Sequence, residues 1–351
     1  MLWPKRHALS LYNLWLMQEI FGLTEQELKA WLVEKGEKPF RAAQILDWLY
    51  KKGAATWEEM TDLSKGLRHQ LAEHFSTQSL KYIRHVDSVD QETTKFLWEF
   101  ADGQKVESVL IRAPDRKTVC VSSQVGCPAR CAFCASGKNG LMRSLSAAEI
   151  VEQVIAIDRK EDVSHVVFMG MGEPFENYEN VLKAIHLLTH QFEISQRRIT
   201  VSTVGIVDKI LRFADEDLKV NLVLSLHAPN QRLRQKIIPY ARKHALEDLL
   251  SAMLHFAKKT KRDITYEYTL LAGINDGKEQ AEELSRLVKG HPCTVNLIPY
   301  NPVDGLQLQR PEKESIEMFR SILDGAKIPT TWRYTKGKDI AAACGQLALQ
   351  N

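Results

Sequence analysis

The stretch that decides the fold is residues 118–134, TVCVSSQVGCPARCAFC. A short apolar run opens it, and Cys127, Cys131 and Cys134 follow with the spacing C-x3-C-x2-C. Three thiolates on one short loop can hold three irons of a 4Fe-4S cluster and leave the fourth iron without a protein ligand. A structural zinc site is the alternative, but tetrahedral zinc normally takes four protein ligands, and no histidine lies nearby to complete the set. The segment therefore predicts an iron-sulfur loop directly after a strand.

Short apolar runs alternate with amphipathic, helix-like segments from this point onward. The runs cover residues 118–124, 164–170, 198–205, 220–228, 264–271 and 293–300. Repeated strand-helix units favour parallel strands with right-handed crossovers. Six units predict an α/β fold, a partial (β/α)6 barrel, and such folds place their chemistry at the carboxyl ends of the strands.

The region before the barrel divides into a helical unit and a β-rich linker. Helical patterns cover residues 24–36, 39–53 and 61–75, with Thr24 and Thr61 as expected N-caps and Gly36 and Gly53 as expected helix ends. Strand patterns follow at 81–89, 93–100 and 105–112. We therefore expect a helical accessory domain at 1–78, a β-rich extension at 79–117, the barrel at 118–335 and a C-terminal loop at 336–351.

Composition indicates an ordinary globular protein with no strong charge bias. The 351 residues include 47 basic and 44 acidic side chains, a formal net charge of +3 that permits a local basic face without proving a nucleic-acid partner. Residues 1–23 lack the features of a signal peptide or a membrane span. Six cysteines in such a chain favour a metal site over a disulfide framework and predict a cytoplasmic location.

The cysteine loop resembles that of the radical S-adenosylmethionine superfamily. In that superfamily the amino and carboxylate groups of S-adenosylmethionine chelate the open iron, and an electron from the cluster cleaves the sulfonium. The resemblance implies that polar residues at later strand ends bind this cofactor, although each would otherwise be an ordinary turn or core residue. These expected cofactor-binding residues are Gly172, Glu173, Ser202, Ser225, Leu226, His227 and Asn301.

Two further cysteines narrow the resemblance. Cys120 precedes the triad and Cys344 lies near the C-terminus; with the motifs GMGEPFEN, VSTVGIV, LSLHAPN and LIPYNP, they resemble the RlmN/Cfr family of RNA adenine methyltransferases over residues 24–348. The resemblance implies that Cys344 accepts a methyl group from one S-adenosylmethionine. A second one yields a 5'-deoxyadenosyl radical that activates this methyl for addition to an electron-poor adenine carbon. Cys120 then releases the product by forming a disulfide with Cys344, and Glu107 accepts the ring proton.

Each of these residues also has an ordinary structural interpretation. An isolated cysteine is most often a small buried residue, and Glu107 alone would be a solvated strand carboxylate. Cys293, in a buried-looking strand, matches no family role. Closure of a disulfide between Cys120 and Cys344 would require the C-terminal loop to fold over the barrel mouth.

The resemblance also implies RNA substrates. Family members act on an adenosine in the peptidyl-transferase region of 23S ribosomal RNA, and many also act on the transfer-RNA adenosine 3' of the anticodon, which must leave its stack to react. The helical unit resembles the family's RNA-binding domain. Its basic and aromatic side chains suit phosphates and exposed bases, or alternatively an amphipathic helix: Lys38, Phe40, Arg41, Trp48, Tyr50, Lys51 and Lys52.

Three functions remain open. Pro174 and the segment from Arg333 to Asp339 resemble the RlmN-type enzymes, which methylate C2 of adenine, although Lys336 stands where the family usually has Arg. A Cfr-type C8 methyltransferase and a non-catalytic, metal-containing RNA-binding protein are the alternatives. We expect one cluster per chain, two S-adenosylmethionine molecules per turnover, a flavodoxin-like electron donor, a thiol reductant, a monomeric state and no membrane association.

Overall fold

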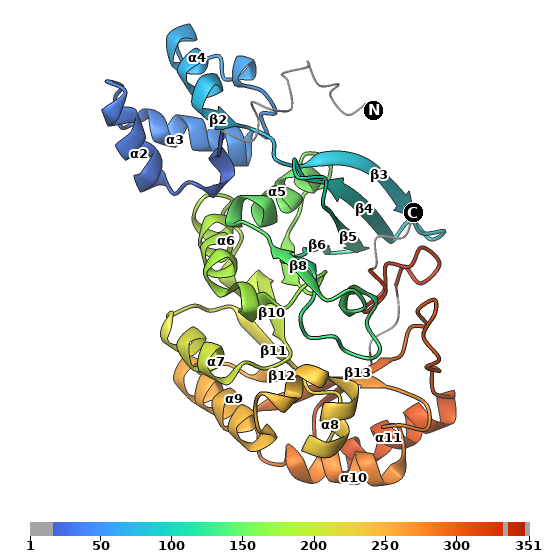
Figure 1. Cartoon of the computed structure of the whole chain (residues 1–351). Coiled ribbons are helices and arrows are strands. Elements are labelled where there is room, and N and C mark those ends of the chain that lie inside the picture. The colour runs from blue at the N-terminus through green and yellow to red at the C-terminus, as the bar shows by residue number, and fades with distance from the viewer. Residues whose placement is uncertain (1–16, 333–335, 348–351) are drawn as a thin grey trace.

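The computed structural model describes residues 17–332 and 336–347, and its centre is one curved sheet (Figure 1). Within these residues the sheet has ten strands in the order β14-β13-β12-β11-β10-β9-β6-β5-β4-β3. The strands from β6 to β14 in this order are all parallel, whereas β3, β4, β5 and β6 pair antiparallel. The chain therefore has the expected α/β fold, a partial barrel extended at one edge.

All six predicted barrel strands are present. They are β6 (Arg116–Cys120), β9 (His165–Phe168), β10 (Ile199–Thr203), β11 (Asn221–Ser225), β12 (Ile264–Leu270) and β13 (Cys293–Pro299). A seventh parallel strand, β14 (Thr330–Trp332), was not predicted, because its three residues carry no apolar run. The short strands β7 (Gln124–Gly126) and β8 (Leu141–Ser144) form a separate hairpin that flanks the cysteine loop.

The connecting helices lie along the outside of the curved sheet (Figure 1). They are α5 (Ala147–Asp158), α6 (Tyr178–His190), α7 (Val207–Asp215), α8 (Gln231–Ile237), α9 (Leu246–Thr260), α10 (Lys278–Leu287) and α11 (Lys313–Gly325). Short 3-10 turns are η4 (Ala135–Gly137), η5 (Pro174–Asn177), η6 (Gln196–Arg198) and η7 (Pro239–Arg242). This arrangement buries the outer face of each strand and leaves the inner face for the site.

The predicted linker strands are β3 (Lys81–Asp87), β4 (Thr93–Glu99) and β5 (Lys105–Ala113). They continue the barrel sheet, since β5 pairs with β6 from Val109↔Cys120 to Ala113↔Arg116. In β4, Phe96 and Trp98 are buried and stack with ring centroids 5.5 Å apart. The β-rich segment is therefore an integral edge of the sheet.

The N-terminal helical unit contains α2 (Glu25–Glu34), α3 (Arg41–Leu46) and α4 (Lys65–His74), with the π-helix η2 (Asp47–Lys51) extending α3. The 3-10 turns η1 (Ile20–Gly22) and η3 (Trp57–Glu59) and the strands β1 (Gln18–Glu19) and β2 (Phe75–Ser76) complete it.

Most of the predicted ends of these helices are confirmed. Thr24 caps α2 in a capping box with Glu27, and Gly36 and Gly53 follow the helical segments with φ of +77° and +66°. The prediction of Thr61 as an N-cap was wrong. Ser64 caps α4 because its hydroxyl accepts the Leu67 amide, and Thr61 lies in the preceding turn.

A buried carboxylate on α5 joins the helical unit to the barrel. Glu152 accepts hydrogen bonds from the amides of Ser79 and Leu80, at 2.8 and 3.2 Å, and from the Ser79 hydroxyl, where the chain passes from β2 to β3. Burial raises the pKa of Glu152 to about 7, against the effect of these donors.

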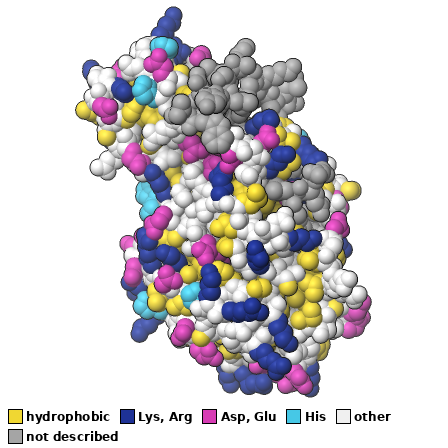
Figure 2. All heavy atoms as spheres, in the orientation of Figure 1, with side chains coloured by type: hydrophobic (Ala, Val, Ile, Leu, Met, Phe, Trp, Pro, Cys, Tyr) yellow, Lys and Arg dark blue, Asp and Glu magenta, His cyan; other side chains and the backbone are white. Residues whose placement is uncertain are grey.

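The surface mixes charges of both signs. On the face drawn in Figure 2, basic and acidic side chains are interleaved over the barrel half of the molecule. The small net charge is therefore not the sum of two segregated patches on this face. Among the described residues, no helix is both long and apolar enough to cross a membrane.

Candidate active site

The three cysteines of the loop line one cavity at the carboxyl ends of the strands. The loop is held by the Cys127 amide, which donates to Gly140 O at 3.0 Å, and by a turn in which Cys134 N–H donates to Cys131 O at 3.1 Å. Gly126 has a φ of +75°, and a Cβ there would lie 2.0 Å from Gly140 O, so only glycine permits this approach of the two backbones.

The donor set fits an iron-sulfur cluster. Burial raises the pKa of Cys127 to about 12 and that of Cys131 further, and repulsion between the thiolates adds to the shift. Three thiolates this close together become favourable when a cationic metal centre neutralises their charge. Among the described residues no three His, Cys, Asp or Glu side chains converge on a single ion. The ligands of a cubane bind different irons and need not converge, whereas those of a zinc ion must.

We define the cysteine cavity by the three cysteines and the polar side chains that share its wall. Of the predicted cofactor residues it contains Gly172, Glu173, Ser202, Ser225, His227 and Asn301, together with Cys344. Leu226 is not brought there: its side chain is fully buried, and its amide donates to Glu267 O at 3.0 Å. Residues from five strand ends thus meet around one space.

Glu173 holds two of these strand ends together. Its carboxylate accepts the Thr203 hydroxyl at 2.6 Å, the Val204 amide at 2.8 Å and the Phe175 amide at 3.0 Å. The side chain is 2% exposed, and burial raises its pKa to about 7 despite these donors. The expected contact of this carboxylate with a cofactor ammonium would therefore be made by a group that three internal donors already orient.

Gly172 is required by close packing next to Glu173. Its φ is +112°, and a Cβ would lie 2.6 Å from Ser123 Oγ and 2.8 Å from the Gln124 amide nitrogen. Both the backbone conformation and the contact exclude a larger residue. The loop after β9 can therefore approach the loop after β6 closely.

Two residues of β12, Glu267 and Thr269, were missed. Both line the cysteine cavity, and Ser202 Oγ lies 3.3 Å from both Ser225 Oγ and Glu267 Oε2. The sequence does contain a signal for Glu267, because an acidic residue inside the otherwise apolar run 264–271 indicates a functional position. Ser202, Ser225 and Glu267 form a polar group on three adjacent strands.

His227 is a neutral hydrogen-bond donor. The Thr269 amide donates to its Nδ1 at 2.9 Å, so the ring proton lies on Nε2. Burial and the nearby Arg234 cation lower its pKa to about 3. Phe133, in the cysteine loop, packs against the ring edge to face with centroids 4.8 Å apart.

Arg234, on α8, was also missed. Its side chain is 0% exposed, and burial lowers its pKa to about 10. The guanidinium donates to the carbonyls of Val204, Leu226 and Ser225, the last two at 3.2 and 3.3 Å. It therefore fixes the ends of β10 and β11, which carry the serine and histidine side chains of the cavity.

Two of the three cysteines outside the triad, Cys120 and Cys344, meet beside the cysteine cavity. Cys120, Cys134 and Cys344 line a second, small gap, which we call the thiol gap. Cys120 is buried, Cys344 is exposed, and neither is in a disulfide. The structure therefore places side by side two residues that are more than 200 positions apart in the chain. Cys293 is buried in β13, as expected for a core residue.

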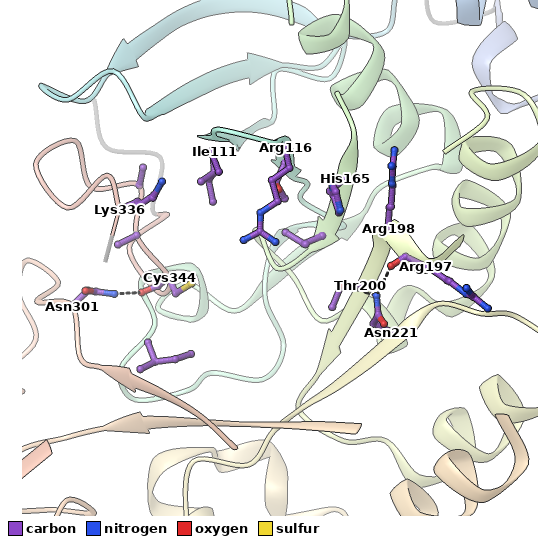
Figure 3. A pocket seen from close by; sticks show the side chains of 16 residues that line it. Ile111, Arg116, His165, Arg197, Arg198, Thr200, Asn221, Asn301, Lys336 and Cys344 are labelled. Atoms are coloured by element: carbon purple, nitrogen blue, oxygen red, sulfur yellow. Dashed lines mark hydrogen bonds between the residues drawn. The ribbon is translucent and has the colours of Figure 1, made fainter. Parts of the chain in front are cut away.

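The C-terminal loop folds over the barrel mouth, as the pairing of the two cysteines required. Asn301 Nδ2 donates to Cys344 O at 3.2 Å, Ala135 N–H to Gly345 O at 2.8 Å and Ser136 Oγ to Leu347 O at 2.7 Å. Asn301, expected to bind the cofactor, thus also anchors the loop of Cys344 (Figure 3).

Glu107 lies in β5 and is buried, not solvated. Lys95 Nζ lies 3.1 Å from Glu107 Oε1, and the two side chains are 11% and 3% exposed. The same Lys95 ammonium donates to Ala341 O at 3.3 Å in the C-terminal loop. The side chain expected to accept the ring proton and the loop that carries Cys344 are therefore linked through one cation.

The basic motif before Cys344 is partly visible. Arg333 lies outside the described residues. Lys336 Nζ lies 2.9 Å from Glu92 Oε2 and donates to Arg112 O at 3.0 Å, and Asp339 accepts the Val89 amide at 2.8 Å. The motif thus ties the C-terminal loop to the strand extension.

One residue of the helical unit that was expected to stack on bases, Tyr50, belongs to the core instead. Tyr50 is buried, and its hydroxyl donates to Phe21 O at 2.9 Å, so the ring belongs to the core. Phe40 is 53% exposed with the Arg41 guanidinium 5.0 Å from its ring centroid, and Lys52 lies 4.1 Å from the Trp48 centroid. Lys51 pairs with Glu193. Phe40 and Trp48 remain candidates for stacking.

Comparison with known proteins agrees with this geometry. Residues 18–76 match the ribosomal RNA large subunit methyltransferase N-terminal domain, and residues 121–287 match the radical SAM superfamily. A probable dual-specificity RNA methyltransferase RlmN 2 from Protochlamydia amoebophila is 60% identical over 93% of both chains. Its counterpart RlmN from Lysinibacillus sphaericus is 48% identical over 95% of this chain and 90% of that one.

A solved structure covers nearly the whole chain. The crystal structure of a radical SAM methyltransferase from Sphaerobacter thermophilus superimposes with a TM-score of 0.93 at 43% identity, over 95% of this chain and 99% of that chain. The cysteine loop, the barrel and the similarity to relatives over nearly their whole length show that the chain belongs to the RlmN family of radical SAM methyltransferases.

Proposed function

We propose that the protein methylates C2 of an adenosine in the peptidyl-transferase region of 23S ribosomal RNA and C2 of the adenosine 3' of the anticodon in transfer RNAs. The observation that carries this proposal is the position of Cys344, which lines both the cysteine cavity and the thiol gap with Cys120. A methyl carrier must reach both a methyl donor and a resolving thiol. Cys344 meets both requirements at one point.

Cys127, Cys131 and Cys134 would hold the 4Fe-4S cluster, one per chain, in this function. When bound, the cluster supplies the electron for reductive cleavage of S-adenosylmethionine. Ser202, Ser225 and Glu267 offer hydroxyl and carboxylate oxygens to the polar groups of that substrate, and His227 offers an Nε2–H donor. Gly172 lets the loop after β9 pack against the loop after β6, which shapes the wall of the cysteine cavity.

Three residues of this chain carry the methyl transfer. Cys344 Sγ attacks as a thiolate, so a bond from sulfur to carbon forms and the donor leaves as a neutral thioether. Glu107 Oε1 receives the proton that the adenine carbon loses. Cys120 Sγ then attacks Cys344 Sγ as a thiolate; the disulfide bond forms, the bond between Cys344 Sγ and the methylene carbon breaks, and that carbon keeps the electron pair and takes up a proton to become the methyl group on the base.

The cycle needs two outside reactants. An external thiol reductant must return the disulfide to two thiols, and a flavodoxin-like donor would supply the electron. Two S-adenosylmethionine molecules are consumed per methylated adenosine, one as methyl donor and one for radical cleavage. We expect the enzyme to act as a monomer in the cytoplasm, where its RNA substrates are.

The test is product analysis with the reconstituted protein. Anaerobic incubation with methyl-labelled S-adenosylmethionine, reductant and either RNA should yield 2-methyladenosine by mass spectrometry. Cys344→Ala should give none, and Cys120→Ala should accumulate protein joined to RNA, whereas Cys293→Ala serves as the matched control in a buried cysteine outside the site. The product 8-methyladenosine would replace the C2 assignment by C8. Full activity of Cys344→Ala would refute the methyl-carrier role.

A further inference from the structure

The inside of the partial barrel is a cavity of about 540 Å³. It is lined by alternate residues of the parallel strands, including Thr118 of β6, His165 and Val167 of β9 and Thr200 of β10. In β9 these inward residues are half-buried, while the intervening Val166 and Phe168 are buried. Since side chains alternate along a strand, the inner face is an open space and not a packed core.

The end of this cavity farther from Cys344 is lined by cationic side chains. Arg116, Arg197 and Arg198 line it at the amino ends of β6 and β10, and all three are exposed (Figure 3). None of them has an ion pair with an acidic side chain in the described part of the chain. His165 lies among them: burial, then Arg198 and Arg116, lower its pKa, with Asp115 acting in the opposite sense. We call this cavity the basic lumen.

The other end of the basic lumen reaches Cys344. Cys344, Asn301 and Ile298 line both the basic lumen and the cysteine cavity, whereas none of the triad cysteines lines the basic lumen. Cys344 therefore stands between two spaces of different character. One contains thiols and strand-end hydroxyls and the other contains guanidinium groups.

We propose that the basic lumen is the binding site of the target nucleotide, an inference that rests on the proposed function. Arg116, Arg197 and Arg198 bind the ribose-phosphate backbone at and beside the extruded residue, and the base extends toward Cys344. Guanidinium groups match phosphate oxygens in charge and in bidentate geometry. S-adenosylmethionine and RNA then approach the same sulfur from opposite sides, so neither must leave for the other to bind.

The test uses Arg116→Gln, Arg197→Gln and Arg198→Gln in the reconstituted holoenzyme. The probe is a short RNA stem-loop with a loop adenosine, and binding is measured by fluorescence anisotropy over a range of salt concentrations. Each variant should bind about tenfold more weakly, the loss of one charge-assisted hydrogen-bonding group. The slope of log affinity against log salt should fall by about 0.7 for each phosphate contact removed.

Three controls separate this role from damage to the fold. Arg232→Gln, an exposed arginine of α8 outside all three cavities, should bind RNA like the wild type. Arg116→Lys should bind RNA more tightly than Arg116→Gln and more weakly than the wild type, because the charge remains while the bidentate geometry is lost. The affinity for S-adenosylmethionine should be unchanged in the Gln variants.

The outcomes distinguish the two proposals. Wild-type affinity and salt slope in all three Gln variants would overturn the assignment of the lumen, even if 2-methyladenosine forms. Equal loss of RNA and S-adenosylmethionine binding would also overturn it, since the arginines would then be structural. If the arginines govern RNA binding but no methylated adenosine appears, the proposed function fails and the RNA site stands.

Discussion

The junction at Glu152 gives the stability of this protein a specific pH dependence. The folded pKa of Glu152 is raised from 4.5 to about 7 by burial on α5. Because the folded state binds this proton more tightly than the unfolded state does, the stabilisation is fully present below about pH 4.5 and is lost as the pH rises through about 7. Glu152→Gln keeps a neutral side chain whose oxygen, in the place of Oε1, can accept the Ser79 and Leu80 amides and whose nitrogen can donate to the Ser79 hydroxyl.

The magnitude follows from the two pKa values. Between about pH 5 and about pH 8, ionisation of Glu152 should lower the free energy of unfolding of the wild type by about 2.5 kcal/mol, a loss that Glu152→Gln avoids. For 351 residues this corresponds to a relative gain of about 3 °C in the melting temperature of the variant.

The assay is differential scanning fluorimetry of holoenzyme at both pH values. Wild type, Glu152→Gln and the exposed control Glu34→Gln on α2 are compared, and the quantity of interest is how the difference from the wild type changes with pH. It should change for Glu152→Gln and stay constant for Glu34→Gln. A constant difference for Glu152→Gln would refute the reasoning, because the buried carboxyl would then titrate as it does in the unfolded chain.

Three further predictions concern the site. Arg234→Met should weaken the affinity for S-adenosylmethionine at least tenfold, measured by equilibrium dialysis, because three buried carbonyls at the ends of β10 and β11 lose their donor. The control Arg232→Met should bind within twofold of the wild type. The same result for Arg234→Met would contradict this prediction. Lys95→Met should lower the free energy of unfolding by about 3 kcal/mol, because it removes the ammonium that faces the buried Glu107. The control Lys81→Met, in an exposed ion pair, should lower it by less than about 1 kcal/mol. Equal melting temperatures of the two variants would show that burial of the first pair has no effect. Gly172→Ala should weaken binding of S-adenosylmethionine and lower the melting temperature more than Gly103→Ala. Gly103 also has a positive φ, +78° against +112° for Gly172, but it has open space around it. Equal effects of the two substitutions would contradict the role of close packing at Gly172.

Local signals predicted most of the fold. The six barrel strands and the three strands of the extension were found, because each is an apolar or alternating run between turn residues. The two misses have different causes. β14 is too short to show a pattern, and the choice of Ser64 over Thr61 depends on where α4 begins, which the packing of Leu67 and Leu71 decides.

The sequence by itself determined the chemical content of the protein: the C-x3-C-x2-C loop, the two further cysteines and the order of strands and helices. These features can be identified from local spacing and motifs without knowledge of tertiary contacts. Only the tertiary structure decided which groups meet. Arg234, Glu267 and Lys95 carry no motif, and they matter because the fold buries them against strand ends and the C-terminal loop. The basic lumen exists for the same reason, since Arg116 and Arg198 are separated by 81 intervening residues and become neighbours only when β6, β9 and β10 align in parallel.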